Sequence, residues 1–350
     1  MRFKFLLNCN GKGMIMRLLS FIFDGVERLG CEFSDDSVID FSDIADVMGD
    51  ASTAPNNMLS LIESGDIGKK NIEALHSYAT ENPDKIQLIP QSDIEWLPPV
   101  PRPGKICGVA LNNSASDERK ISSPDHPMFF LKPTTSLVGH GQPIVARPQY
   151  MGFHPEPELG VIISKMAKEI DPAQGMDYVY GYTIIDDVTG NDMRAQDRVH
   201  YYALYPKADN PDEVEKREQH LSYTARYKGA DGFGPMGPWL VTRDEVPDPH
   251  VLDVSCAVGG EIFTEDNTKN YTYRVEEVIA YISRYLTLEA GDVVSMGTAF
   301  RAGDNTGKPL HSANFARLDG PCEISISKLG TLSNPIVKET KDPGDWRLPR

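Results

Sequence analysis

Apolar and polar residues alternate over short stretches along most of this chain, a pattern that predicts strands more often than helices. Near the start, residues 16–33 ("MRLLSFIFDGVERLGCEF") predict two strands joined at an Asp-Gly pair, a common hairpin turn. Later apolar segments also predict strands; they are residues 105–111, 143–148, 158–164, 178–188, 292–298 and 322–330. Because strands rarely alternate with helices, the pattern indicates a β-rich α+β fold and not a doubly wound one.

Only a few segments have helical spacing. Residues 55–80 are amphipathic and predict helix, and residues 274–288 carry apolar side chains near helical spacing, with Leu286 as the last. The highly charged segment 200–222 contains prolines and interrupts the β pattern, so we expect an inserted surface loop or a short helix there. Its three tyrosines are expected to cover a pocket; they are Tyr201, Tyr202 and Tyr205.

The proline-dense stretch "WLPPVPRPG" at residues 96–104 is the clearest linker in the chain. It divides a small N-terminal domain (16–95) from a main domain (105–337), with a C-terminal tail at 338–350. Residues 1–15 are basic and partly apolar, but no small-residue cleavage site follows them, so we interpret them as an extension. Met14 and Met16 are alternative starts.

Charge and cysteine content narrow the possible partners. The chain has 51 acidic and 35 basic residues, a formal net charge of −16, which disfavours nucleic acid or an anionic membrane as a partner. No apolar run reaches the roughly 20 residues that cross a bilayer. Five widely separated cysteines favour reduced thiols and therefore a cytoplasmic protein.

Acidic residues cluster around two of the predicted strands. Glu156 and Glu158 are two residues apart at a strand start, so both side chains point to one face of a sheet. Asp186 and Asp187 follow another apolar strand, where a buried charge needs neutralising. Carboxylates alone suit Mg²⁺, Mn²⁺ or Ca²⁺ better than Zn²⁺. A solvated pair on an edge strand is the alternative for the two glutamates.

Four motifs in order resemble those of the fumarylacetoacetate hydrolase superfamily. They read "EPEL", "GYTIIDDVT", "KGADGFGPMGP" and "LEAGDVVSMGT", and the similarity spans about two thirds of the chain, from Lys105 to Val337. The resemblance implies the family's mixed β-sandwich or roll with a small N-terminal domain. It also implies a metal centre of Mg²⁺ (or Mn²⁺) held by Glu156, Glu158 and Asp187.

The resemblance also implies roles around that metal. Lys228 would act beside it, and the substrate would be held by Thr298 and Gly297, together with Lys132 and Arg194. The implied substrate is a small 2-oxo acid, and the implied assembly is a homodimer or a higher homo-oligomer.

One family feature is missing. Hydrolases of the family carry a histidine and a glutamate in a short lid segment, whereas here the corresponding positions are Ser116 and Arg119. Asp117 or Glu118 could replace the missing base, although a plain surface loop is the alternative. His154 precedes the two glutamates and could act as a base, but an ordinary structural histidine is the simpler interpretation.

The sequence therefore predicts a metal-dependent enzyme that cleaves a C–C bond of an acylpyruvate-like 2-oxo acid by hydrolysis. The alternatives are a hydratase, dehydratase, decarboxylase or isomerase that uses the same polarised 2-oxo group, or a member that has lost catalysis. No dinucleotide fingerprint, phosphate-binding loop or serine-nucleophile motif is present to support another class of enzyme.

Overall fold

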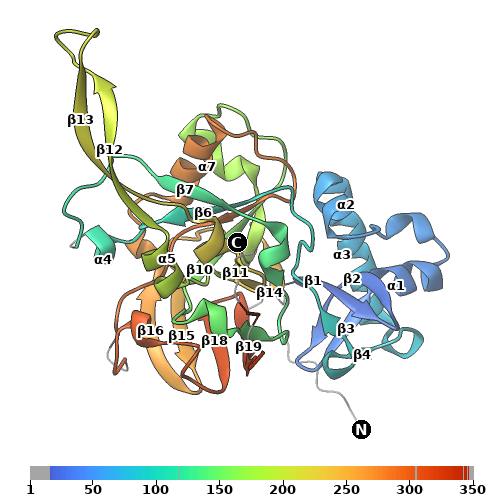
Figure 1. Ribbon diagram of the computed structural model, residues 1–350. Helices are drawn as coiled ribbons and strands as arrows, with labels where there is room; N and C mark the ends of the chain where they lie inside the picture. Colours follow the sequence, from blue (N-terminus) through green and yellow to red (C-terminus); the bar gives the residue numbers. More distant parts are fainter. Residues whose placement is uncertain (1–15, 118, 304–305, 342, 345, 347–350) are drawn as a thin grey trace.

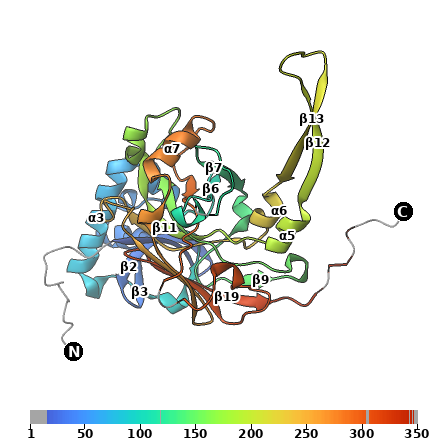
Figure 2. The ribbon, with the colours of Figure 1, turned by 90° about the vertical axis from the view of Figure 1, so that its left-hand side faces the viewer.

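The computed structural model describes residues 16–117, 119–303, 306–341, 343–344 and 346, shown in Figures 1 and 2. Its strands form a 12-stranded mixed sheet, a five-stranded sheet and a separate two-stranded ribbon. Short helices fill the connections. The β-rich α+β fold predicted from the sequence is confirmed. No helix in the described part of the chain is long and apolar enough to cross a membrane.

The large sheet runs through both predicted domains. Its strand order is β4-β3-β2-β1-β14-β11-β10-β17-β6-β7, with β5 paired to β1 and β8 to β14. Because β1 pairs with β14, the N-terminal strands extend the sheet that carries the acidic residues. The bounds are β1 Arg17–Phe23, β2 Val26–Ser34, β3 Ser37–Asp40, β4 Ile89–Pro90, β5 Glu95–Trp96, β6 Ile106–Ala110, β7 Met128–Lys132, β8 Leu137–Val138, β10 Pro157–Ile163, β11 Val179–Asp186, β14 Gly234–Thr242 and β17 Val293–Ser295.

The five-stranded sheet packs against the large one and closes the main core. Leu159 of β10, Val254 of β15 and Ile324 of β18 belong to one buried cluster, so the core lies between the two sheets. The strand order is β16-β15-β18-β19-β9. Its bounds are β9 Ile144–Ala146, β15 Asp253–Val258, β16 Glu261–Asn267, β18 Pro321–Ile326 and β19 Gly330–Lys338.

The α-helices are short, and three of them lie beside the N-terminal strands. α3 buries Ile72, Leu75 and Ala79, which lie at helical spacing on one face, in a second core cluster shared with α1 and α2. The bounds are α1 Phe41–Met48, α2 Met58–Glu63, α3 Gly65–Glu81, α4 Ser114–Asp117, α5 Asn191–Gln196, α6 Ala225–Gly229 and α7 Val275–Ser283. Helix α7 ends at Ser283 and is shorter than the predicted segment 274–288, so Leu286 lies beyond its end.

Two segments differ from the sequence-based expectation. The charged segment predicted as a loop or short helix is an antiparallel ribbon of β12 (Arg198–Pro206) and β13 (Val214–Ser222), which projects from the body in Figures 1 and 2. The Gly/Pro-rich stretch after Lys228, which is not among the predicted strands, contains the fully buried strand β14. Glycine and proline obscured β14 because both are unusual inside strands.

Candidate metal centre

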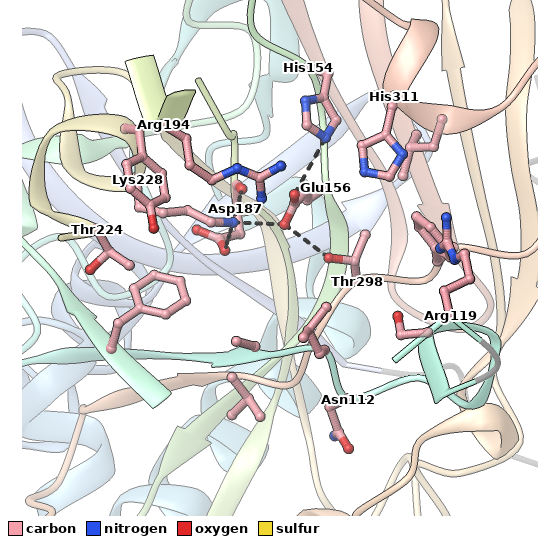
Figure 3. A pocket seen from close by; sticks show the side chains of 18 of the residues that line it. Asn112, Arg119, His154, Glu156, Asp187, Arg194, Thr224, Lys228, Thr298 and His311 are labelled. Carbon is pink, nitrogen blue, oxygen red and sulfur yellow. Dashed lines mark hydrogen bonds and ion pairs between the residues drawn. The ribbon is translucent and has the colours of Figure 1, made fainter. Parts of the chain in front are cut away.

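The pairing of β10 with β11 brings the predicted acids together. The two strands are antiparallel, and Pro157 is paired with Asp186, so the start of β10 lies beside the end of β11. Glu156, Glu158 and Asp187 each place a carboxylate oxygen within 4.8 Å of the others. Figure 3 shows Glu156 and Asp187 facing each other across the Lys228 ammonium. The three acidic residues predicted as metal ligands therefore lie close together in the fold.

Burial makes this cluster electrostatically demanding. Glu158 and Asp187 are each 1% exposed, and burial followed by repulsion from Asp187 raises the pKa of Glu158 to about 8. Burial also raises the pKa of Asp186 to about 7. Burial acts the same way on Glu156, but Lys228 and then His154 outweigh it and hold the pKa of Glu156 well below its usual value. For Glu158, the attraction of Lys228 lowers the pKa but does not offset burial and the repulsion from Asp187.

Two buried lysines neutralise part of the negative charge. The Lys228 ammonium donates to Glu156 Oε2 at 2.7 Å and also pairs with Asp187 Oδ2. The Lys132 ammonium lies 2.7 Å from Asp187 Oδ1 and donates to the carbonyl oxygens of Lys228 and Phe233. Burial lowers the pKa of Lys228, but the three surrounding carboxylates more than reverse this and raise it. The carboxylates therefore favour the charged form of Lys228.

Neutral donors hold the glutamates in place. Glu158 accepts from the Ser295 hydroxyl and from the Gly297 amide at 2.9 Å. The Thr298 hydroxyl lies 3.0 Å from Glu156 Oε2 and 3.1 Å from Glu158 Oε1, so it can donate to either. These contacts use the end of β17 as a support for both ligand candidates. The Gly297 amide is thereby engaged with Glu158.

A divalent cation fits this donor set. Among the described residues, no ammonium or guanidinium lies within ion-pair distance of Glu158, although its carboxylate is buried beside two others. An uncompensated buried carboxylate is costly, and a cation shared by three carboxylates removes that cost. Oxygen ligands favour Mg²⁺ or Mn²⁺ over Zn²⁺. The residues that would hold the ion are Glu156, Glu158 and Asp187.

A cavity of about 540 Å³ opens onto the carboxylates. Glu156 and Asp187 line it together with Lys228 and Thr298, whereas Glu158 lies beneath them. Further lining side chains supply positive charge and imidazole; they are Arg119, Lys120, His154, Arg194 and His311. Figure 3 shows Arg194 directed toward Asp187 and His311 toward Glu156. The cavity can therefore accept a small anion next to a metal.

The other predicted site residues take different places. Lys132 is 3% exposed and lies behind Asp187, outside the cavity lining. Asp117 pairs with the Lys120 ammonium and accepts from the Thr272 hydroxyl at 2.9 Å, and it lines a neighbouring cavity. Glu118 lies outside the described residues. Asp117 is thus already committed to partners away from the carboxylates.

The ribbon expected to cover the pocket does not reach the cavity. No residue of β12 or β13 is among its described lining residues, which instead include Arg194 and Thr224 at the two bases of the ribbon. The expectation failed because pairing of the two strands extends the segment outward as a stiff ribbon.

His311 is the functional candidate that sequence reasoning missed. Burial lowers its pKa to about 4, with nearby His154 adding to the effect, so it is neutral at pH 7. The His154 Nδ1 lies 3.0 Å from the side-chain amide nitrogen of Asn191, and its Nε2 lies 3.4 Å from Glu156 Oε1. His154 thus orients Glu156. No local motif marks His311, since the chain fold alone brings it here.

A substitution of Gly297 tests whether the segment after β17 holds the two glutamates in place. Its φ of +102° disfavours any side chain, and an added Cβ would lie 2.7 Å from the buried Asn112 Cβ. We expect Gly297→Ala to lower the free energy of unfolding by about 2–4 kcal/mol and to weaken metal binding. Denaturant unfolding and calorimetric Mg²⁺ titration measure both.

Gly141→Ala is the matched control for that substitution. Gly141 also has a positive φ, +73°, but an added Cβ meets nothing within 4 Å. The Gly141→Ala variant should lose about 1–2 kcal/mol of the free energy of unfolding, from backbone strain alone, and retain full metal affinity. Equal losses in both variants would show that the contact with Asn112 carries no weight.

Comparison with known proteins places these features in a wider context. A family model described as fumarylacetoacetate (FAA) hydrolase C-terminal matches residues 105–337. The chain is 31% identical over 284 residues to oxaloacetate tautomerase Fahd2a, mitochondrial, of Rattus norvegicus, covering 81% of this chain and 80% of that protein. The corresponding human protein, FAHD2A, is 29% identical over 286 residues and covers 81% of each chain.

Solved structures agree with the fold. Maleylpyruvate hydrolase from Sphingobium sp. SYK-6, in complex with manganese(II) and pyruvate, is 25% identical with a TM-score of 0.63. The alignment covers 93% of this chain and all of that one. A 5-carboxymethyl-2-hydroxymuconate delta-isomerase from Mycobacterium smegmatis shares the fold at 21% identity and a TM-score of 0.61, with 93% of this chain and 100% of that chain covered.

Proposed function

We propose that this chain, a member of the fumarylacetoacetate hydrolase family, is a metal-dependent enzyme. It would interconvert the keto and enol forms of a small 2-oxo dicarboxylic acid of the oxaloacetate type. The observation that carries the proposal is the carboxylate cluster opening into a cavity that also presents a neutral imidazole and two guanidinium groups. The relatives named as oxaloacetate tautomerases support the same reaction.

The carboxylate cluster prepares the substrate's carbonyl group. When bound, Mg²⁺ or Mn²⁺ supplies Lewis-acid polarisation of a 2-oxo group; the manganese in the maleylpyruvate hydrolase complex supports this choice of cation. Lys228 lines the cavity and its three N–H groups donate to Glu156 and Asp187, so it would stabilise negative charge on the substrate oxygen through its own positive charge. Thr298 keeps Glu156 and Glu158 aligned.

The proton transfer needs one neutral base. Forming the enol moves a proton from the carbon beside the carbonyl to the carbonyl oxygen. His311 is neutral, lines the cavity and has no role in holding the carboxylates, so a ring nitrogen of His311 would accept the carbon-bound proton and return it to oxygen. His154 is less suited because both of its ring nitrogens already face partners, Nδ1 the Asn191 side-chain amide and Nε2 the Glu156 carboxylate.

Hydrolytic cleavage remains a second prediction, with weaker support in the cavity. Hydrolysis requires a base that activates water, and the positions where relatives carry that pair are Ser116 and Arg119 here. Asp117, the proposed substitute, is held by Lys120 and Thr272. Tautomerisation needs no water as a reactant, so it makes fewer demands on these residues.

The arginines indicate the substrate's second charged group. Arg194 and Arg119 both line the cavity and both act on the pKa of His311, which places their positive charges near that ring. A second carboxylate of a four-carbon 2-oxo dicarboxylate would pair with one of them. We therefore expect oxaloacetate to be preferred over a 2-oxo monocarboxylate of equal length.

The test is a turnover screen with Mg²⁺ or Mn²⁺ on enol oxaloacetate, 2-oxobutanoate and an acylpyruvate. Enol absorbance is followed in time, and the products are identified by mass. Metal-dependent loss of the enol with no change in mass establishes the tautomerase. Two fragments formed from the acylpyruvate, with the enol of oxaloacetate untouched, would make the protein a hydrolase instead.

His311→Gln is expected to lower turnover about 100-fold while leaving the Mg²⁺ affinity unchanged, because it removes the base and no ligand. Steady-state kinetics at saturating metal measures the loss. His76→Gln, a change on α3 in the N-terminal part of the chain, is the control and should retain full activity. Wild-type turnover in His311→Gln would exclude it as the base.

The cytoplasmic location and the homo-oligomeric assembly expected from the sequence stay predictions.

A further inference from the structure

The β12–β13 ribbon carries a histidine pair that the proposed function does not use. Most residues of both strands are exposed, and the ribbon stands clear of the body in Figures 1 and 2. A two-stranded ribbon on its own is marginally stable in water. Whatever fixes this one must therefore lie within the ribbon or come from outside the chain.

Strand register places three metal-ligating side chains on one face of the ribbon. His200 is directly opposite His220, and Glu218 lies two residues before His220, so all three project from the same side. The two imidazole rings stack with centroids 4.0 Å apart and an interplanar angle of 11°. Their potential ligand atoms, with a Glu218 carboxylate oxygen, lie within 4.8 Å of one another.

Both imidazoles present Nε2 to the same carboxylate oxygen. The His200 Nε2 is hydrogen-bonded to Glu218 Oε1, and the His220 Nε2 lies 3.7 Å from that oxygen. Two protonated imidazoles stacked across the strands would repel each other, since like charges directly opposite in a sheet are destabilising. Neutral rings sharing one cation with the carboxylate satisfy all three groups.

We propose that this face of the ribbon binds a zinc ion through the imidazole nitrogens of His200 and His220 and the carboxylate of Glu218. Two imidazoles and one carboxylate form a common Zn²⁺ ligand set, with a water molecule completing the tetrahedron. The side chains of His200, Glu218 and His220 are 54%, 55% and 62% exposed, so the two rings are free to turn out of their stacked arrangement toward a shared ion.

The ribbon site and the carboxylate centre select different ions. The carboxylate centre offers only oxygen atoms, which suit Mg²⁺ or Mn²⁺, whereas the ribbon offers nitrogen, which suits Zn²⁺. A zinc ion joining β12 to β13 would act as a clip near the base of the ribbon, because His200 and His220 lie close to where the strands leave the body. Zinc would thereby stiffen the ribbon without taking part in turnover.

The test titrates Zn²⁺ into the metal-stripped full-length protein in excess Mg²⁺, which occupies the carboxylate centre. Competition with a chromogenic chelator gives the number of zinc ions bound and their affinity. We expect the wild type to bind one zinc ion that His200→Ala/His220→Ala loses or binds at least about tenfold more weakly. Hydrogen exchange of residues 198–222 should slow with zinc in the wild type and not in the double variant.

Further variants keep the result interpretable. Glu218→Gln removes the carboxylate with little change of shape and should also weaken zinc at least about tenfold. His126→Asn, a histidine outside the ribbon, should bind zinc as the wild type does, and all these variants should retain Mg²⁺-dependent activity. Equal zinc binding by the wild type and the double variant, or no zinc binding by the wild type, would overturn the proposal.

Discussion

Asp187→Asn is expected to abolish Mg²⁺ and Mn²⁺ binding and to lower turnover at least about 1,000-fold. The substitution keeps the shape of the side chain but removes a negative charge from a buried cluster whose Asp187 is 1% exposed. Asp187→Asn also removes the negative charge that lies between the Lys132 and Lys228 ammonium groups. The two ammonium groups would then repel an incoming metal ion more strongly. Isothermal titration with Mg²⁺ and Mn²⁺ electron paramagnetic resonance measure the loss directly.

Asp186→Asn is the matched control for the metal prediction, since it makes the same change one residue earlier. Asp186 accepts from the Glu156 amide at 2.7 Å and points away from the cluster toward Cys322, so an amide can take its place. This variant should retain metal binding. Metal affinity at the wild-type level in Asp187→Asn would show that the ligand assignment is wrong.

The sequence predicts the acidic cluster well because its parts are local. Glu156 and Glu158 share a strand face by the two-residue period, and Asp187 directly follows an apolar strand. Only one further fact is needed to bring them together, namely that β10 and β11 are antiparallel neighbours. The β-rich fold was predicted for the same reason, since its strands carry their own alternating signal.

The remaining parts of the molecule depend on contacts between distant segments. His311 and Arg119 reach the cavity from opposite ends of the main domain. His311 stands in no recognisable pattern, and Arg119 was noted only as the position where the family's lid glutamate is missing. The continuity of the large sheet through β1 and β14 is equally non-local. The ribbon was not predicted because β13 is largely charged and polar, and because the apolar and aromatic side chains of β12 stand on both of its faces, so neither strand shows an apolar alternation.

Lys132 was predicted to hold substrate, but its position suggests a structural role with a large energetic effect. Its ammonium group is fully buried behind Asp187 and has three partners: Asp187 Oδ1 and two main-chain carbonyl oxygens. Burial lowers the pKa of Lys132, and the attraction of Asp187 acts in the opposite direction. Removing this ammonium leaves buried acceptors without a donor.

We expect Lys132→Met to reduce the free energy of unfolding by about 3–5 kcal/mol in metal-free protein, because breaking a buried ion pair strands the remaining charge. Denaturant unfolding followed by tryptophan fluorescence, in the presence of a chelator, gives the value. Lys69→Met is the control, since the Lys69–Asp244 pair has the same 2.7 Å separation but side chains that are 38% and 55% exposed. That surface pair should contribute less than about 1 kcal/mol.

The comparison between the two lysines separates burial from pairing. If the ion pair itself were the source of stability, both substitutions would cost the same, and the argument from burial would fail. If Lys132→Met loses several kcal/mol more of the free energy of unfolding than Lys69→Met, Lys132 supports the Asp187 carboxylate. The KM of the metal-loaded variant then tests whether Lys132 also contacts the substrate. We expect an unchanged KM, because the Lys132 ammonium lies behind Asp187 and outside the cavity lining. An unchanged KM excludes direct contact.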